Sequence, residues 1–221
     1  MMGAQCYGER EGNVSFLLTD SRSLCFPEET LFFALRSARN DGQHYIAELY
    51  QRGVRRFVVA EVPDRWQANY ADATFLVVGD TLAALQQLAA RHRQRFAIPV
   101  VGITGSNGKT TTKELVSRVL AEKYEVYATR GNLNNHIGVP LTLLAMTRDV
   151  EFGIVEMGAS ACGEIALLCS IAEPNYGIVT NIGRAHLEGF GGPEGVRRGK
   201  GELLDYAVRY GRILMLATSK P

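Results

Sequence analysis

Residues 98–113 read IPVVGITGSNGKTTTK, and this stretch decides the fold of the second half of the chain. It begins with Ile98–Thr104, an apolar run of the kind that parallel sheets bury on both faces. A Gly-rich turn follows, and a helix is expected next, over Thr111–Lys123. A buried strand, a Gly-rich turn and a helix are the context that a phosphate-binding loop requires. The stretch therefore predicts a nucleotide-binding domain built on a parallel sheet.

The turn Gly105–Thr110 carries the groups that hold the phosphates of a nucleoside triphosphate. Glycine lets backbone amides approach phosphate oxygens, and the new helix directs its positive end at them. Lys109 adds a charge for the β- and γ-phosphates, and Thr110 offers a hydroxyl to Mg²⁺. The strict G-x-x-x-x-G-K-[ST] spacing needs glycine where this chain has Ile103, so the loop is a variant. We expect ATP to contact Gly105, Ser106, Asn107, Gly108, Lys109, Thr110 and Thr111.

Outward from this turn, strands and helices alternate in both directions along the chain. Downstream strands are expected at Glu125–Ala128, Phe152–Met157, Tyr176–Thr180 and Arg212–Leu216, with helices at Gly163–Ile171 and Glu194–Val208. Upstream strands are expected at Val14–Leu18, Thr30–Leu35, Arg56–Ala60 and Phe75–Val78, with a helix at His44–Arg52. The prediction is an α/β protein in three parts. A small α/β domain (1–80) and a connecting helix (81–97) precede a doubly wound, mostly parallel P-loop domain (98–221).

Charge and composition exclude several partners. The 24 Lys and Arg residues balance 23 Asp and Glu residues, which leaves no electrostatic case for nucleic acid or an acidic membrane surface. No apolar run approaches the ~18 residues that span a bilayer. Cys6, Cys25, Cys162 and Cys169 lack metal-site spacing and are expected to be reduced core residues. We expect a cytoplasmic monomer that binds neither nucleic acid nor membrane.

Six further motifs accompany the phosphate loop. They are TDSR at 19–22, DGQH at 41–44, GNLNN at 131–135, IGVPLT at 137–142, IVEMGA at 154–159 and TNIGRAHLEGFG at 180–191. Together with TGSNGKTTT the set resembles the Mur ligases of peptidoglycan synthesis, in order and over nearly the whole chain. The residues of GNLNN and AHLEGFG resemble the corresponding motifs of family members that add D-alanyl-D-alanine to UDP-N-acetylmuramoyl-tripeptide.

The resemblance implies a metal site. Glu156 ends a strand that should lie beside the loop strand, where a carboxylate can reach a Mg²⁺ that bridges phosphates. A solvated or helix-capping acid is the alternative. The resemblance also implies that His186 binds metal, and that Lys200 is carbamylated and helps to hold a second Mg²⁺. From the residues alone, His186 fits a surface or core histidine, and Lys200 fits a solvated helix lysine. Catalytic roles are implied for Lys109, His186 and Lys200.

Substrate contacts are expected from two loops. Asn134, expected at ATP, and Asn135, expected at substrate, precede a helix in which Pro140 suits the first position. Ser21 and Arg22 follow a strand and are expected to hold a diphosphate or uridine, because arginine offers phosphate a planar fork. Turn chemistry is the alternative for the two asparagines, and a plain turn explains Ser21 and Arg22 equally well without the resemblance.

The implied reaction is amide formation driven by ATP with Mg²⁺. A carboxylate of UDP-N-acetylmuramoyl-tripeptide attacks the γ-phosphate to give an acyl phosphate, which the amine of D-Ala-D-Ala then displaces. The family has three domains, and this chain ends within the central one, so we expect a fragment that does not ligate alone. The alternatives are a Mur-type ligase for another amino acid and a non-catalytic nucleotide- or UDP-sugar-binding module. A GTPase is disfavoured because no N/T-K-x-D segment is present.

Overall fold

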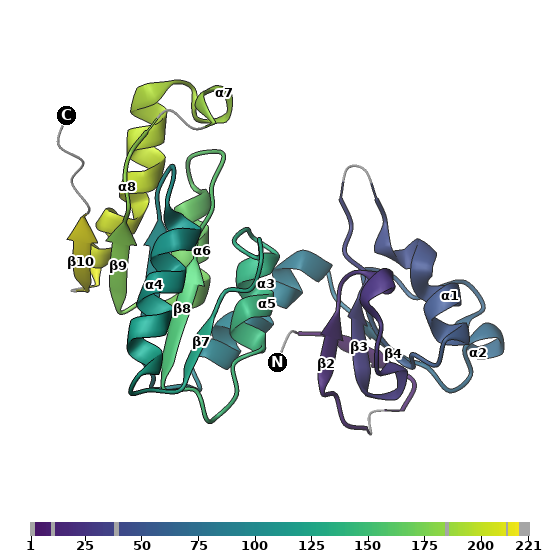
Figure 1. The fold of residues 1–221 in the computed structure, drawn as a ribbon. Helices are drawn as coiled ribbons and strands as arrows, with labels where there is room; N and C mark the ends of the chain where they lie inside the picture. The colour runs from purple at the N-terminus through teal and green to yellow at the C-terminus, as the bar shows by residue number, and fades with distance from the viewer. Residues whose placement is uncertain (1–2, 10–11, 38–39, 184–185, 211, 217–221) are drawn as a thin grey trace. The chain divides into compact units, whose positions relative to one another are not determined.

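The computed structural model describes residues 3–9, 12–37, 40–183, 186–210 and 212–216 (Figure 1). The chain divides into two compact units, Met1–Gln87 and Leu88–Pro221. The division falls within helix α3 (Thr81–Arg93), inside the segment that the sequence assigns to a connecting helix. Both units contain a largely parallel sheet with helices, which confirms the predicted α/β class.

The first unit is built on a five-stranded sheet. Its strand order is β1 (Gln5–Tyr7), β5 (Thr74–Val77), β4 (Arg56–Val59), β3 (Thr30–Phe33) and β2 (Phe16–Leu18). Among the strand pairs of the described residues in this sheet, only β1–β5 is antiparallel. The first unit also contains helices α1 (Ile46–Gln51) and α2 (Trp66–Asn69). Short 3₁₀ turns lie at Ser21–Ser23, Pro27–Glu29 and Gly42–Tyr45. Its core is rich in aromatic residues, with Phe57 stacked on Phe75 at 5.4 Å between ring centres.

The second unit carries an all-parallel sheet. The strand order is β10 (Ile213–Leu216), β9 (Tyr176–Val179), β6 (Val100–Thr104), β8 (Phe152–Glu156) and β7 (Val126–Ala128). Its helices are α4 (Lys109–Ala121), α5 (Gly138–Leu144), α6 (Glu164–Ala172), α7 (Leu187–Phe190) and α8 (Pro193–Arg209). The loop strand β6 therefore lies in the centre of the sheet, between β8 and β9.

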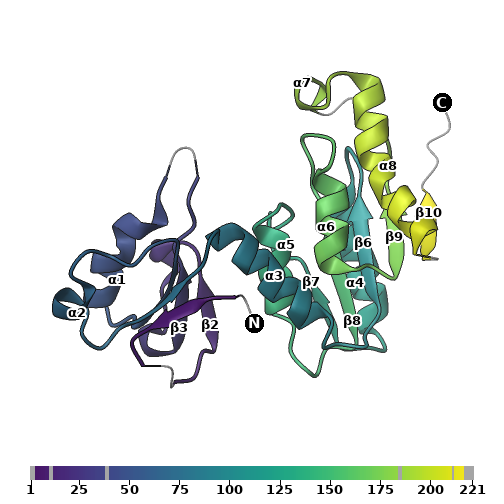
Figure 2. The ribbon, with the colours of Figure 1, turned by 180° about the vertical axis from the view of Figure 1, so that it is seen from behind.

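Helices cover both faces of this sheet. Val101 and Ile103 of β6 pack toward α4 on one face, which Figure 1 shows in front of the strands. Val100 belongs to the core on the other face, where α5 and α6 lie, as Figure 2 shows from behind. Successive strand residues point to opposite faces, so a strand covered on both sides is apolar throughout. This explains the run Ile98–Thr104 and confirms the doubly wound prediction.

Several details of the sequence prediction are wrong. Strand β1 and helices α2 and α7 were not anticipated, and α4 begins at Lys109 rather than Thr111. Helix α5 begins at Gly138, so Pro140 occupies its third position rather than its first. Proline is tolerated there because the first four helical N–H groups have no partner within the helix.

The cysteines are not all core residues. Cys169 is fully buried, whereas Cys25 and Cys162 are exposed and Cys6 is intermediate. Cys169 lies on the inner face of α6, while Cys162 precedes that helix in a surface turn. Within the described part of the chain, no helix combines the length and the apolar character needed to cross a bilayer.

Candidate functional site

The Gly-rich loop has a backbone that only glycine allows at two positions. Gly105 has φ +145° and Gly108 has φ +77°, conformations that residues with a β-carbon rarely adopt. A Cβ on Gly105 would lie 2.0 Å from Thr180 Oγ1, whereas one on Gly108 would meet nothing within 4 Å. Glycine is therefore needed at 105 for space and conformation, and at 108 for conformation alone.

The segment after β9 holds the loop in shape. Thr180 Oγ1 donates to Asn107 O at 2.6 Å, and the Asn107 N–H donates to Asn181 Oδ1 at 3.0 Å. The Ser106 N–H donates to Asn181 O at 3.1 Å, and the Gly183 N–H donates to Ser106 Oγ at 2.8 Å. The sequence prediction gave Thr180 and Asn181 no such role. The available signal was two polar residues directly after an apolar strand.

Lys109 and Thr110 occupy the start of α4. The Lys109 ammonium donates to Gly105 O at 2.8 Å, so the charge is held over the loop. Thr110 Oγ1 donates to Glu156 Oε2 at 3.0 Å across from β8. Ser106 is buried, whereas Asn107, Thr110 and Thr111 are exposed at the loop and helix start.

Glu156 is the buried centre of this arrangement. Glu156 is only 2% exposed. Asn134 Nδ2 donates to its Oε1 at 2.8 Å, and Thr110 Oγ1 donates to its Oε2. The carboxylate thus joins the start of α4 after the Gly-rich loop, β8 and the loop before α5. The prediction that Glu156 ends a strand beside the loop strand is confirmed, because β8 pairs with β6. A merely solvated acid is excluded by its burial.

This donor set fits Mg²⁺. The ion prefers oxygen ligands at about 2.0–2.1 Å in octahedral geometry, so neighbouring ligands stand about 3 Å apart. Thr110 Oγ1 and Glu156 Oε2 stand 3.0 Å apart. Among the residues that the structure describes, no three His, Cys, Asp or Glu side chains gather as a metal site. One carboxylate suits Mg²⁺ bound partly by phosphates and water, rather than a cage made of protein ligands alone.

His186 and Lys200 both lie near Lys109 of the Gly-rich loop. His186 precedes α7 with φ +56° and lines a cavity of about 460 Å³ together with Lys109, Asn134 and Glu164. Lys200 on α8 is 1% exposed, and its ammonium donates to Ala159 O at 3.2 Å. Glu156 and Lys200 do not line this cavity. Of the surrounding motif, residues 184 and 185 lie outside the described residues.

Lys200 is not a solvated helix lysine. Burial lowers its pKa from 10.5 to about 8, and the positive charge of Lys109 adds to the effect. The acids Glu164 and Glu202 oppose the shift. The ammonium also lies 5.3 Å from the centre of the Phe190 ring, a cation–π distance. A substantial fraction of Lys200 is therefore the neutral amine just above neutral pH.

The residues expected at substrate make local contacts. Asn135 Oδ1 accepts from the N–H groups of Ile137 at 3.1 Å and Gly138 at 2.8 Å, which caps α5. The Arg22 guanidinium donates to Asp20, from Nε to Oδ1 at 2.9 Å and from Nη2 to Oδ2 at 2.6 Å. These bonds hold the Asp20 pKa at about 2. Ser21 is buried in the same turn. Turn chemistry thus accounts for these contacts, and a substrate role for Ser21, Arg22 or Asn135 stays a prediction.

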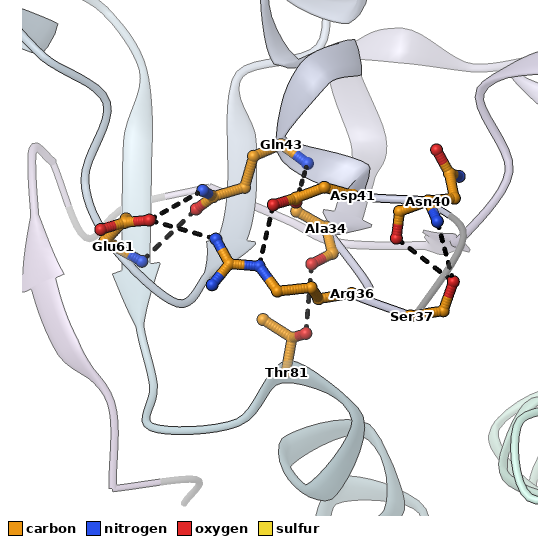
Figure 3. A network of polar contacts seen from close by, with 8 residues as sticks. All are labelled: Ala34, Arg36, Ser37, Asn40, Asp41, Gln43, Glu61 and Thr81. Carbon is orange, nitrogen blue, oxygen red and sulfur yellow. Dashed lines mark hydrogen bonds and ion pairs between the residues drawn. The ribbon is translucent and has the colours of Figure 1, made fainter.

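The other N-terminal motif belongs to a polar network on the first unit (Figure 3). Arg36 Nε donates to Asp41 Oδ2 at 2.8 Å, and Arg36 Nη2 donates to Glu61 Oε1 at 3.1 Å. Asp41 also accepts from the Gln43 N–H at 3.0 Å, which begins the turn Gly42–Tyr45. Arg36 is half exposed, so solvent screens both ion pairs and they contribute little to stability. The network therefore shapes a surface more than it stabilises the unit.

Comparison with known proteins places these features in a family. Residues 103–220 match the family model described as the Mur ligase middle domain. The UDP-N-acetylmuramoyl-tripeptide–D-alanyl-D-alanine ligase of Bacillus subtilis is 42% identical over 187 residues, 85% of this chain and 40% of that protein. The same-named enzyme of Escherichia coli is 37% identical over 95% of this chain and 45% of its own length. This chain therefore spans less than half the length of these relatives.

Solved structures agree. A crystal structure of MurF from Acinetobacter baumannii matches with a TM-score of 0.82 and 32% identity, over 92% of this chain and 48% of that one. MurF ligase from Thermotoga maritima, solved in complex with ADP, matches with a TM-score of 0.76 and 29% identity. That match covers 90% of this chain and 49% of the other.

Proposed function

We infer the function from one established premise, that this chain belongs to the Mur ligase family. We propose that the protein carrying it joins D-Ala-D-Ala to UDP-N-acetylmuramoyl-tripeptide, the two substrates that the names of its relatives state for them, and that cleavage of ATP drives the reaction. Because the chain spans less than half of those relatives, the complete reaction is assigned to the whole protein. The nucleotide phosphates are assigned to this chain. We also place the protein in the cytoplasm as a monomer.

The contact between Thr110, Glu156 and Asn134 carries this proposal. It joins the phosphate loop to a buried strand-end acid through bonds of 3.0 and 2.8 Å. These bonds hold a buried carboxylate against a hydroxyl of the first helical turn, and both oxygens suit Mg²⁺. We assign Thr110 and Glu156 to Mg²⁺, and Asn134 to the orientation of Glu156 as well as to ATP.

The chain's own groups divide the work of binding and charge neutralisation. The loop amides from Gly105 to Thr111 hold the phosphates, and the Lys109 ammonium neutralises charge that builds on them during transfer. When bound, Mg²⁺ would supply further positive charge at the same oxygens. Catalysis is then mostly positioning and electrostatics, because the substrate carboxylate and the amine carry out the covalent steps.

We further propose that Lys200 is carbamylated and that it holds a second Mg²⁺ with His186. The neutral amine attacks CO₂, a C–N bond forms as one C=O π bond opens, and the proton lost from nitrogen passes to water to give the carbamate anion. The low pKa of Lys200 favours this step, because only the unprotonated amine is nucleophilic. The carbamate would also replace a buried cation by an oxygen ligand of the kind that Mg²⁺ prefers.

Two calorimetric titrations test the proposal. Mg-ATP should bind this chain, and UDP-N-acetylmuramoyl-tripeptide should bind it through the first unit, to which we assign Ser21 and Arg22, with Asn135 as a further contact. Binding of neither ligand would contradict the proposal. Binding of the UDP compound alone would support the assignment of this substrate to the first unit. It would contradict the assignment of the nucleotide site to this chain.

A further inference from the structure

Lys113 is a buried lysine that the proposed chemistry does not use. It lies one helical turn after Lys109 on α4 and is only 3% exposed. A buried ammonium costs free energy unless hydrogen bonds replace its water, and methionine or leucine would fill the same space more cheaply. The contacts of Lys113 therefore indicate what this charge is for.

The Lys113 ammonium holds the end of β7. Its Nζ donates to Thr129 O at 2.7 Å, just after the last residue of that strand. The ammonium also contacts Glu114 Oε1 at 3.0 Å, but the Glu114 side chain is 56% exposed. The strong, buried contact is thus with the backbone of Thr129.

Thr129 in turn holds Glu156. The Glu156 N–H donates to Thr129 Oγ1 at 2.9 Å, and the Thr129 N–H donates to Ile154 O at 2.9 Å. Thr129 is 2% exposed, so these bonds are shielded from water. The carbonyl of Thr129 faces Lys113 while its hydroxyl and N–H face the strand that carries the acid. One residue therefore connects the buried lysine to the backbone of Glu156.

We propose that Lys113 is a positioning residue for Glu156, acting through Thr129. The proposal rests on the proposed function for its purpose, which is to place the carboxylate against Thr110 where Mg²⁺ would bind. Lys113 fixes Thr129 against α4, the helix that also carries Thr110. The Glu156 carboxylate and the Thr110 hydroxyl are therefore both fixed relative to α4. The distance between them is set by packed, hydrogen-bonded groups rather than by a free strand end.

The test uses Lys113→Met and Thr129→Val, which remove the ammonium and the hydroxyl with little change in volume. Lys123→Met, which removes an exposed lysine just beyond α4, is the matched control. One readout is the rate of amide hydrogen exchange at the Glu156 N–H, compared with the rate at the Thr180 N–H. Thr180 follows β9, on the other side of β6 from Glu156, and its N–H donates to Thr104 O at the end of β6. The other is the affinity for ADP measured with Mg²⁺ and again with EDTA.

Both core variants should speed exchange at Glu156 about tenfold more than at Thr180, the effect of losing one strong hydrogen bond. They should weaken ADP binding about three- to tenfold in Mg²⁺ and leave it unchanged in EDTA, a smaller loss than removal of a direct support of a metal ligand. Lys123→Met should change neither. If Lys113→Met does not fold, Thr129→Val decides with the same readouts.

Three results overturn the proposal. The first is equal acceleration at Glu156 and Thr180, which means general destabilisation. The second is unchanged exchange at Glu156, and the third is equal weakening of ADP with and without Mg²⁺. If the wild-type chain shows no Mg²⁺-dependent affinity for ADP, the proposed function fails. The exchange readout then still decides whether Lys113 positions Glu156.

Discussion

Replacement of Gly105 by alanine should damage the second unit more than any other single methyl group added to its loop. The new Cβ would lie 2.0 Å from Thr180 Oγ1, far inside contact distance. The residue would also be held at φ +145°, where alanine is strained. Backbone strain of this kind costs about 2 kcal/mol, and overpacking that moves a neighbour costs about 2 kcal/mol more. We therefore expect the free energy of unfolding to fall by about 4 kcal/mol.

The neighbour that must move makes this cost hard to relieve. Thr180 Oγ1 donates to Asn107 O at 2.6 Å, so its displacement opens the loop itself. Gly201→Ala is the matched control, since Gly201 lies within α8 and a Cβ there meets nothing within 4 Å. That change should raise stability by about 0.5–1 kcal/mol, because alanine favours the helix.

Urea unfolding followed by circular dichroism measures both variants. The chain's single tryptophan, Trp66, belongs to the first unit, so its fluorescence reports that unit separately and should not change. A loss below about 1 kcal/mol in Gly105→Ala would show that the loop relaxes freely, and would refute the claim that Thr180 and Asn181 fix its shape.

Three further predictions follow from burial and charge. Glu156→Gln should weaken Mg-ATP binding about 10- to 100-fold, as measured by calorimetry. The control Glu122→Gln, at the exposed end of α4, should leave the affinity unchanged. Equal effects of the two substitutions would contradict the metal role of Glu156. The folded state depresses the Lys200 pKa to about 8, so the unfolded chain binds more protons between pH 8 and 10.5. Stability should therefore rise with pH in that window relative to Lys200→Met, and parallel curves would contradict the shift. Burial raises the pKa of Cys169 to about 12, so a thiol reagent should label exposed Cys25 quickly and Cys169 only on unfolding; rapid native labelling of Cys169 would refute its burial.

The sequence predicts the framework of the site because its signals are local. An apolar run followed by a Gly-rich turn identifies β6 and the loop without any tertiary information. Glu156 also ends an apolar strand, but its metal role was predicted from the resemblance to the Mur ligases. Helix α8 carries Lys200 and covers the helix that was expected at Glu194–Val208.

What escaped prediction depends on distant partners. Lys113 reads as one more polar residue of a helix, and only the fold shows that its ammonium is buried against Thr129. Asn181 supports the loop from a position 74 residues away. Strand β1 has three residues and is stabilised by pairing with β5, far along the chain. Short elements of this kind carry too little periodicity to be recognised.

Backbone amide resonances of the chain, followed during titration with Mg-ADP, test the central claim most directly. We predict saturable shifts at Gly105–Thr111 and at Glu156, with the Glu156 shift lost when EDTA replaces Mg²⁺. Shifts confined to other residues, or none at millimolar Mg-ADP, would contradict the assignment of this loop and its buried acid to nucleotide phosphates.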